Sequence, residues 1–324
     1  MCTAITYKTD KFYVGRNLDY EFDYGQKILI TPRNKILPFN HTDKSEKHYA
    51  IIGMGIEENG FPLYFDAVNE KGLAVAGLNF VGNAFYSSIK ENKLNLAQFE
   101  FVPYILANCA NIKEVKKILS KLNIDNESFS EKYPPSQLHW LIADKNECIT
   151  VESLKDGLHV YENIPGVLTN NPPFEMQMFN LNNYMSLSNQ NPTNKFSKKL
   201  KLNIYSRGMG AMGLPGDLSS SSRFVKCCFT KLNSRNKTDE INSISQFFHI
   251  LTSVEQQMGC CEVKKGEYEY TIYSSCMNCD EGIYYYTTYF NHRINAVNMF
   301  NFDLDGSQIY QKEIINTEDI NYQK

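Results

Sequence analysis

A cysteine stands directly after the initiator methionine, at Cys2. A thiol with an ordinary pKa of about 8.5 is a weak nucleophile at neutral pH unless a base or a positive charge draws off its proton. If Met1 is removed, Cys2 also carries a free α-amine, whose ordinary pKa of about 8 allows it to accept that proton. One residue would then supply nucleophile and base, which indicates attack on a carbonyl carbon.

Such a cysteine needs a cation beside the sulfur and a carboxylate beside the amine. The alternating residues on both sides of a turn at Lys8–Lys11 predict a β-hairpin. If the turn is centred between Thr9 and Asp10, Cys2 lies opposite about Asn17, although a slip of one residue would reverse which side chains share a face. Arg16 and Asp19 are then the candidates for the cation and the carboxylate.

Three further candidates lie far along the chain. Asn79 and Asn170 each end a predicted strand, where an amide could donate a hydrogen bond to the oxyanion formed during attack. Arg223 falls at the start of a predicted helix, where it could hold a carboxylate or assist the developing charge.

Length and charge limit the class of protein. The chain has 324 residues, enough for one large domain or two ordinary ones, and a formal net charge of -3, which argues against a nucleic-acid partner. It contains no secretory signal and no apolar run of the roughly 18 residues that a membrane span needs. We therefore expect a cytoplasmic protein with no membrane insertion, whose nine cysteines are mostly buried thiols.

The remaining pattern predicts antiparallel sheets covered by helices. Strands are expected at 63–68, 73–80, 138–143, 148–152, 158–161, 268–274, 283–289 and 294–302, and helical spacing at 96–122, 223–229 and 240–257. No linker divides the chain, so a single domain spanning 1–324 is expected. A polar stretch around 185–207 interrupts it and is the candidate subunit contact.

Several motifs occur in a characteristic order from one end of the chain to the other. They are Met1-Cys2-Thr3, Gly15-Arg16-Asn17-Leu18-Asp19, Ala76-Gly77-Leu78-Asn79-Phe80, Leu138-His139-Trp140, Leu168-Thr169-Asn170-Asn171-Pro172, Gly213-Leu214-Pro215-Gly216-Asp217, Ser222-Arg223-Phe224 and Tyr268-Glu269-Tyr270-Thr271. Together they make the chain resemble the choloylglycine hydrolases, the bile salt hydrolase and penicillin V acylase family of N-terminal nucleophile hydrolases.

The resemblance implies an α+β fold, a four-layer αββα sandwich of two antiparallel sheets between helices. It implies hydrolysis of the amide bond of glycine- and taurine-conjugated bile salts, without a cofactor or metal, by a homotetramer. The residues that match the family's catalytic positions are Cys2, Arg16, Asp19, Asn79, Asn170 and Arg223. The candidates for an apolar groove that takes the steroid are Leu18, Tyr24, Phe65 and Leu138.

Asn79 favours the bile salt branch, because penicillin V acylases tend to carry tyrosine at the matching position. Two other functions remain open from the sequence: an amidase of the same mechanism acting on penicillin V or another acyl amide, and a non-catalytic steroid-binding protein. A zinc site is disfavoured, because Cys260 and Cys261 are adjacent and do not repeat the spacing of Cys276 and Cys279. A papain-like Cys-His pair is disfavoured too, since His139, His249 and His292 lie in no recognisable catalytic context.

Overall fold

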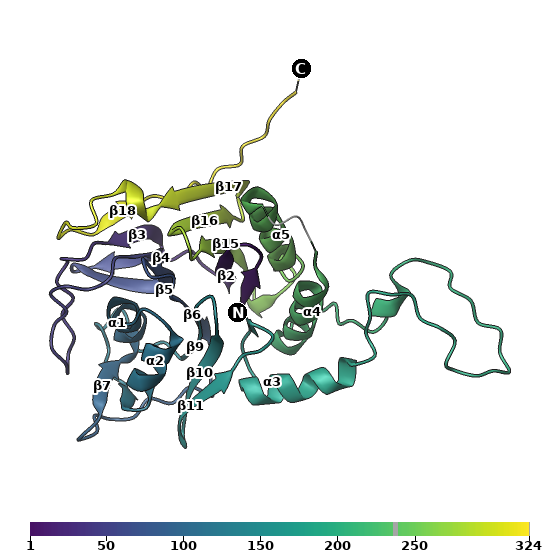
Figure 1. Ribbon diagram of the computed structural model, residues 1–324, viewed down its shortest axis with the longest axis horizontal. Coiled ribbons are helices and arrows are strands. Elements are labelled where there is room, and N and C mark those ends of the chain that lie inside the picture. Colours follow the sequence, from purple (N-terminus) through teal and green to yellow (C-terminus); the bar gives the residue numbers. More distant parts are fainter. Residues whose placement is uncertain (236–238, 324) are drawn as a thin grey trace.

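The computed structural model describes residues 1–235 and 239–323. Two antiparallel sheets lie face to face at its centre, and helices cover the outer face of each (Figure 1). The six-stranded sheet has the order β12 (Val167–Leu168), β1 (Cys2–Lys8), β2 (Phe12–Tyr20), β15 (Tyr270–Asn278), β16 (Ile283–Thr288) and β17 (Asn291–Asn298). The eight-stranded sheet has the order β11 (Gly157–Glu162), β10 (Cys148–Leu154), β9 (Leu138–Ala143), β6 (Ala74–Asn79), β5 (Phe61–Asn69), β4 (Ile51–Glu58), β3 (Lys27–Thr31) and β18 (Tyr310–Lys312). This is the four-layer αββα arrangement predicted from the sequence.

The predicted hairpin between β1 and β2 forms, but its register differs from the prediction. Lys8 pairs with Phe12 across a turn of three residues, so Cys2 is opposite Leu18. The predicted pairing of Cys2 with Asn17 is therefore wrong by one residue. A turn of two residues was assumed, and each added turn residue moves the partner by one.

This shift decides which side chains share a face of the sheet. Ala4 pairs with Arg16, and directly opposed residues point to the same face. Arg16 and Leu18 therefore lie on the face of Cys2, toward the second sheet. Asp19 lies on the opposite face, toward the helices.

Helices cover the outer face of each sheet. The helices α1 (Phe101–Asn108) and α2 (Ile112–Leu119) cover the eight-stranded sheet, and α4 (Ser220–Asn233) and α5 (Glu240–Thr252) cover the six-stranded sheet (Figure 1). Side-chain caps begin three of them: Asn111 for α2, Ser219 for α4 and Asp239 for α5. The cap at Ser219 places Arg223 in the first turn of α4, pointing at the hairpin.

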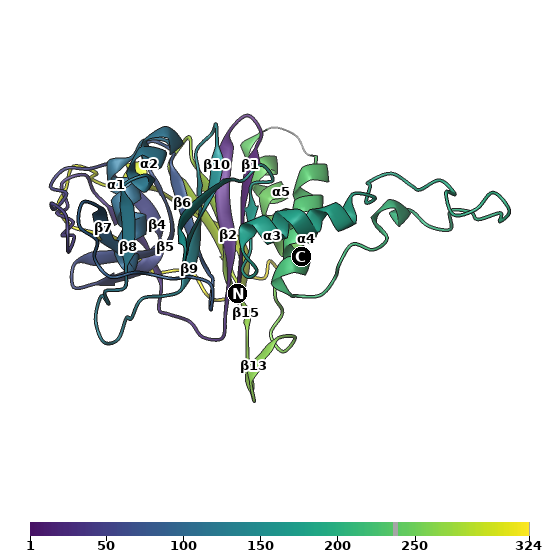
Figure 2. The ribbon, with the colours of Figure 1, turned by 90° about the horizontal axis from the view of Figure 1, so that it is seen from below.

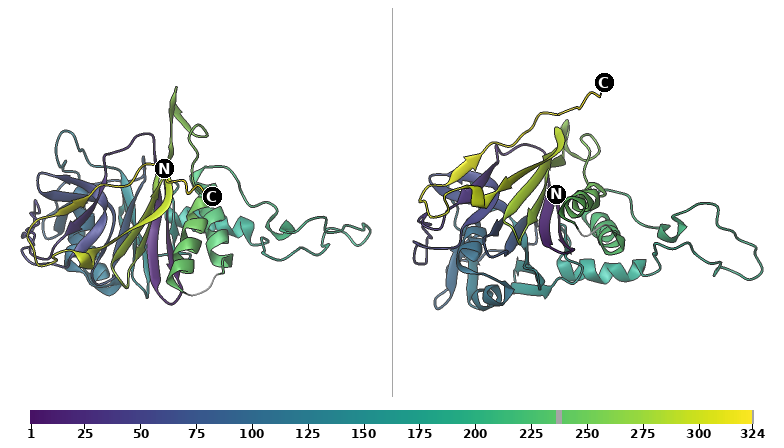
Figure 3. Two further views of the ribbon diagram at one scale, coloured as in Figure 1. Left: turned by 90° about the horizontal axis from the view of Figure 1, so that it is seen from above. Right: turned by 45° about the horizontal axis from the view of Figure 1, so that its top comes forward.

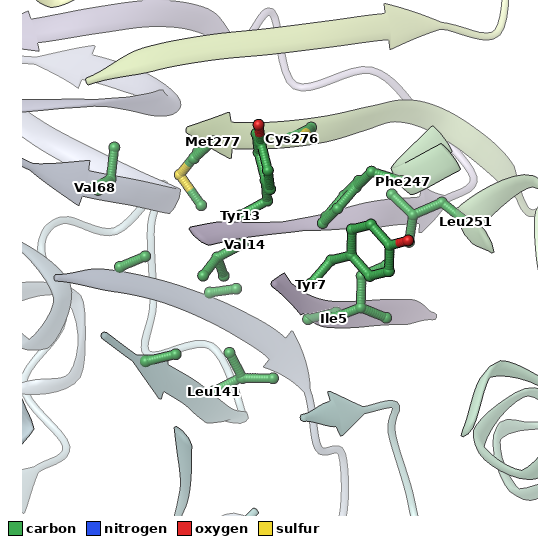
Figure 4. Packing of buried hydrophobic residues seen from close by; sticks show 14 of the residues in the cluster. Ile5, Tyr7, Tyr13, Val14, Val68, Leu141, Phe247, Leu251, Cys276 and Met277 are labelled. Carbon is green, nitrogen blue, oxygen red and sulfur yellow. The ribbon is translucent and has the colours of Figure 1, made fainter. Parts of the chain in front are cut away.

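Alternating side chains of the strands fill three apolar layers, one between the sheets and one under each pair of helices. In β9, Leu141 belongs to the layer between the sheets and Ile142 to the layer under α1 and α2. Figure 4 shows Val14, Val68 and Leu141 between the sheets, with Ile5 on the helix-covered side of the other sheet. A fully buried side chain of this size contributes about 1.5–3 kcal/mol, so these layers hold the sheets in a fixed relation.

Three predicted elements differ from the observed ones in where they begin or end. Leu96 lies in β7 (Leu94–Ala97), which pairs in parallel with β8 (Leu122–Asp125), and not in a helix. The predicted strand 294–302 ends at Asn298, whose side chain accepts a hydrogen bond from the Phe300 N–H and begins a 3₁₀ turn. The predicted helix 240–257 ends at Thr252, because the next residues turn inward, where Gln256 binds a β15 side chain.

A long segment leaves the body after α3 (Phe174–Asn180) and returns at α4. We call residues 185–216 the arm; it extends far from both sheets (Figure 2). Most of its large apolar side chains are exposed, with Phe196 at 83 % and Tyr205 at 79 %. The end of the chain, beyond β18, is a second extended segment (Figure 3).

Candidate active site

The sulfur of Cys2 lies between the two sheets, beside Arg16. Arg16 Nη2 donates to Cys2 Sγ, and its Nη1 donates to the carbonyl oxygens of Phe65 and Gly77 on the second sheet. Burial by itself would lower the pKa of Arg16, but the facing charges of Cys2, Tyr273 and Asp66 raise it. The guanidinium therefore remains a fixed positive charge that favours the thiolate.

A buried carboxylate, Asp66, lies close enough to Arg16 to interact with its charge. It accepts hydrogen bonds from the hydroxyls of Tyr273 and Tyr284, each at 2.6 Å, and from Ser275 at 3.2 Å. Burial raises the pKa of Asp66, while Arg16 and these hydroxyls act in the opposite direction. The sequence analysis missed this residue, since nothing around it marks a site.

Asp19 is held on the other face of β2. Thr271 Oγ1 donates to its Oδ1 at 2.6 Å, and Gln256 Nε2 lies 3.5 Å from its Oδ2. Arg223 Nη1 is 3.9 Å from the same oxygen. Asp19 is thus buried among donors and oriented from strand β15 and from the segment that follows α5.

The first nitrogen of the chain as described belongs to Met1. Its ammonium pairs with the Glu269 carboxylate and donates to the Asp19 carbonyl oxygen at 2.6 Å. Burial lowers the pKa of this ammonium, and Arg223 and Arg16 act in the same direction. The nitrogen of Cys2 is a peptide N–H here, and it donates to Asn170 Oδ1 at 2.8 Å.

Asn170 is oriented by three partners. Its Oδ1 accepts from the Cys2 N–H and from Arg223 Nη2 at 2.7 Å, and its Nδ2 donates to the Asn79 carbonyl oxygen at 2.7 Å. Two donors on one end of the amide and an acceptor on the other fix which atom is oxygen. Among the described residues, the contact of Nδ2 with Asn79 uses one of its two hydrogens, so the other is available to a further acceptor.

Arg223 connects helix α4 to the hairpin of β1 and β2. Its Nη1 donates to the Cys2 carbonyl oxygen and to Thr3 Oγ1 at 2.6 Å, and its Nε donates to the Leu218 carbonyl oxygen at 2.9 Å. Burial lowers its pKa, and Asp19 and Cys2 act against that. Five of the six predicted catalytic residues are therefore linked through side-chain contacts around Cys2, and Asn79 joins them through its backbone.

A cavity of about 510 Å³ opens at Cys2 and Asn79. All four residues expected in an apolar groove line it: Leu18, Tyr24, Phe65 and Leu138. The rings of Tyr24 and Phe65 meet edge to face, with centroids 5.4 Å apart. The cavity can take a large apolar body whose polar end reaches the sulfur.

Sequence reasoning missed other parts of the cavity wall, namely Tyr20, Phe22, Phe99 and Phe129. Tyr20 and Phe22 could have been suspected, because they alternate with Tyr24 directly after the Arg16–Asp19 motif. Phe99 lies in a short 3₁₀ helix, Gln98–Glu100, and Phe129 in a loop distant in sequence; their rings pack edge to face with centroids 5.1 Å apart, a contact that only the fold creates.

The cysteines considered for a zinc site differ in their burial. Cys276 and Cys279 are buried in and beside β15, whereas Cys260 is exposed. In the described part of the chain, the group that could hold a metal ion is His41, Asp125 and Glu127, and it contains no cysteine. No helix in that part has the length and apolarity needed to cross a membrane.

Comparisons with known proteins agree with this geometry. The family model for linear amide C–N hydrolases, choloylglycine hydrolase family, matches residues 2–312. The chain is 55% identical over 309 residues to a bile salt hydrolase/transferase of Lactiplantibacillus plantarum, covering 95% of each chain. It is 39% identical over 333 residues to a bile salt hydrolase/transferase of Clostridium perfringens, covering 99% of each.

Solved structures give the same result. The crystal structure of the C2A mutant of the Clostridium perfringens conjugated bile acid hydrolase is similar at a TM-score of 0.93, with 35% identity and full coverage of both chains. A penicillin V acylase from Agrobacterium tumefaciens shares the fold at a TM-score of 0.75 and 18% identity, covering 96% of this chain and 91% of the other. With a cysteine at position 2 and the αββα sandwich, the chain belongs to the choloylglycine hydrolase family of linear amide C–N hydrolases.

Proposed function

We propose that the chain hydrolyses the amide bond of glycine- and taurine-conjugated bile salts, with Cys2 as the nucleophile after removal of Met1. The single observation that carries this proposal is the position of Cys2 Sγ, which lies beside Arg16 in the wall of a mainly apolar cavity. The names of the relatives in Lactiplantibacillus plantarum and Clostridium perfringens support the substrate class.

The reaction begins when the Cys2 amine takes the thiol proton and the sulfur attacks the amide carbon. Asn79 and Asn170 donate to the oxyanion, and Asn170 Oδ1 keeps the amine in place through the contact that it makes with the Cys2 nitrogen. The amine then passes its proton to the leaving nitrogen, and the C–N bond breaks. Water attacks the resulting thioester, the amine accepts its proton, and the free acid leaves as the thiol re-forms.

The charged groups have separate roles in this scheme. Arg16 faces the sulfur and stabilises the thiolate. Asp19 and Arg223 lie on the other face of β2 and hold the terminal residue, since Arg223 binds the Cys2 carbonyl oxygen. Both arginines are buried, so their charges act in a medium of low polarity, where they are more effective than in water.

The steroid nucleus occupies the apolar part of the cavity, against Leu18, Tyr24, Phe65 and Leu138. The acyl side chain of the bile salt then places the scissile amide at Cys2, and the glycine or taurine points toward the opening of the cavity.

Amino-acid release from taurocholate, glycocholate and penicillin V tests the proposal. We expect release from both bile salts and slower turnover of penicillin V. Faster turnover of penicillin V would instead support the acylase function. Binding of taurocholate with no release by wild-type protein would support a non-catalytic steroid-binding protein.

A second activity is favoured by the names of two relatives, which include a transferase function. A thioester intermediate can react with an amine in place of water, which transfers the acyl group to a new nitrogen. Incubation of taurocholate with excess glycine should then produce glycocholate, detectable by mass spectrometry. Formation of free cholate alone would exclude this transfer.

We further propose that the chain acts as a single domain in the cytoplasm and assembles as a homotetramer, with residues 185–207 of the arm in the subunit contact. The exposed Phe196 and Tyr205 support this assignment, because apolar side chains so far from the body are stabilised by covering them.

A further inference from the structure

A buried histidine, His139, lies between the two segments that carry Asn79 and Asn170. It sits on β9 and is fully buried, opposite Leu78 in the sheet. The reaction scheme above gives it no part. Its surroundings nevertheless connect it to both asparagines.

The ring of His139 makes two hydrogen bonds. Nε2 is 2.8 Å from the carbonyl oxygen of Thr169, the residue before Asn170, and Nδ1 is 2.9 Å from Glu152 Oε1. A carbonyl oxygen can only accept, so Nε2 must carry a hydrogen. A second hydrogen is shared between Nδ1 and the buried carboxyl group of Glu152, which also accepts from the Phe174 N–H at 3.0 Å.

The face of the same ring contacts the other segment. Phe80, the residue after Asn79, stacks on the imidazole with centroids 4.2 Å apart and planes inclined by 7°. Phe80 is itself fully buried, and its N–H donates to the Gln137 carbonyl oxygen at 2.7 Å. One rigid ring therefore sets the spacing between Asn79 and Asn170, whose own link is the bond from Asn170 Nδ2 to the Asn79 carbonyl oxygen.

We propose that His139, oriented by Glu152, is a positioning residue that aligns the oxyanion donors Asn79 and Asn170 with the carbonyl that Cys2 attacks. This inference rests on the proposed function. Misplacing a reacting group by about 1 Å can cost roughly 100-fold in rate, so a buried contact of this kind affects turnover without touching substrate.

The test compares three substitutions of His139. His139→Phe keeps the ring and removes both hydrogen bonds; His139→Asn can replace the Nδ1 contact, and His139→Gln can replace the Nε2 contact to Thr169. We expect kcat for taurocholate to fall roughly 10- to 100-fold in the Phe and Asn variants. KM should change less than about threefold, and His139→Gln should recover most of the turnover.

A second measurement separates alignment from a general loosening of the site. Iodoacetamide alkylates Cys2 without forming an oxyanion, so the rate of Cys2 alkylation should stay within about twofold of wild type in every His139 variant.

His48→Phe is the matched control, because His48 is also buried and its ring nitrogens also face acceptors, the carbonyl oxygens of Tyr49 and Lys35. That variant should lose stability to a similar degree and keep its kcat.

Each outcome has one meaning. An unchanged kcat in His139→Phe overturns the inference, as does an alkylation rate that falls in parallel with kcat, or equal losses in the Gln and Asn variants. If wild-type protein releases no amino acid, the proposed function fails and the inference falls with it. If wild-type protein is active and the variants match it, the inference alone fails.

Discussion

The site around Cys2 and the arm differ in how far the fold of one chain buries their side chains. Around Cys2 the side chains of Arg16, Asp19 and Arg223 are almost fully buried, and each has partners within the chain. In the arm, Phe196 and Tyr205 are almost fully exposed. The site is organised by the fold of a single chain, whereas the arm has apolar surface that a single chain leaves uncovered.

This difference in burial indicates that turnover depends on the site and subunit association on the arm. Buried charges are stable only when their partners are fixed, so the site tolerates little change. Exposed apolar residues add nothing to the stability of one chain, so changing them should affect association alone. Substitutions in the two regions should therefore have separable effects.

The largest effect is expected at Cys2. Cys2→Ala removes the sulfur and should lower kcat by roughly 10⁴-fold or more, because no other group in the scheme can form the thioester. Bile salt binding, measured by calorimetry, should persist. Intact mass of the active wild-type protein should show that Met1 is absent, and active protein that retains Met1 would contradict the amine as the base.

A smaller loss is expected at Asn170. Asn170→Ala removes an oxyanion donor and the acceptor that faces the Cys2 nitrogen, so kcat should fall about 10²- to 10³-fold. The neighbouring Asn171→Ala is the control, because the Asn171 amide donates at the surface, to the Val81 carbonyl oxygen at 2.7 Å. Equal losses in both variants would mean that the segment, and not the amide of Asn170, is what matters.

In the arm we expect a change of assembly with little change of kcat. Phe196→Ser with Tyr205→Ser should shift the oligomer toward smaller species in light scattering, since two large apolar side chains are lost from the contact. Ile241→Ser, at an exposed position of α5, is the control and should leave the assembly intact. A tetramer that survives the arm substitutions would separate the arm from the subunit contact.

The smallest effect is expected where the arm meets α4, at Asp217. Hydrogen bonds from Ser219 and Ser222 lower the pKa of Asp217 from 3.8 to about 2. A lowered pKa in the folded state means that the ionised group stabilises the fold above pH 4, and that this contribution disappears as the pH falls toward 2. Asp217 is exposed, so Asp217→Asn should cost about 0.5 kcal/mol or less at pH 7.

Urea unfolding of wild type and Asp217→Asn at pH 7 and at pH 2 checks this sign. The difference in the free energy of unfolding should be present at pH 7 and much smaller at pH 2. A difference that grows toward low pH would contradict the lowered pKa.

Much of the fold followed from local pattern. The alternation around Lys8–Lys11 identified the first hairpin, and the runs at 138–143 and 283–289 became β9 and β16 almost unchanged. These elements are set by side-chain periodicity over a few residues, which a sequence shows directly. The inward turn after Thr252 had no such signal, because it depends on Thr271 and Asp19, which lie on other strands.

The sequence by itself determined the chemistry available: a thiol that becomes N-terminal when Met1 is removed, two arginines, a carboxylate and two asparagines. Only the tertiary structure decided their arrangement. A turn of three residues put Arg16 on the face of Cys2, and the packing of α4 brought Arg223 to the Cys2 carbonyl oxygen. The physical reason is that register and layer packing depend on contacts between residues far apart in the chain, which local periodicity does not specify.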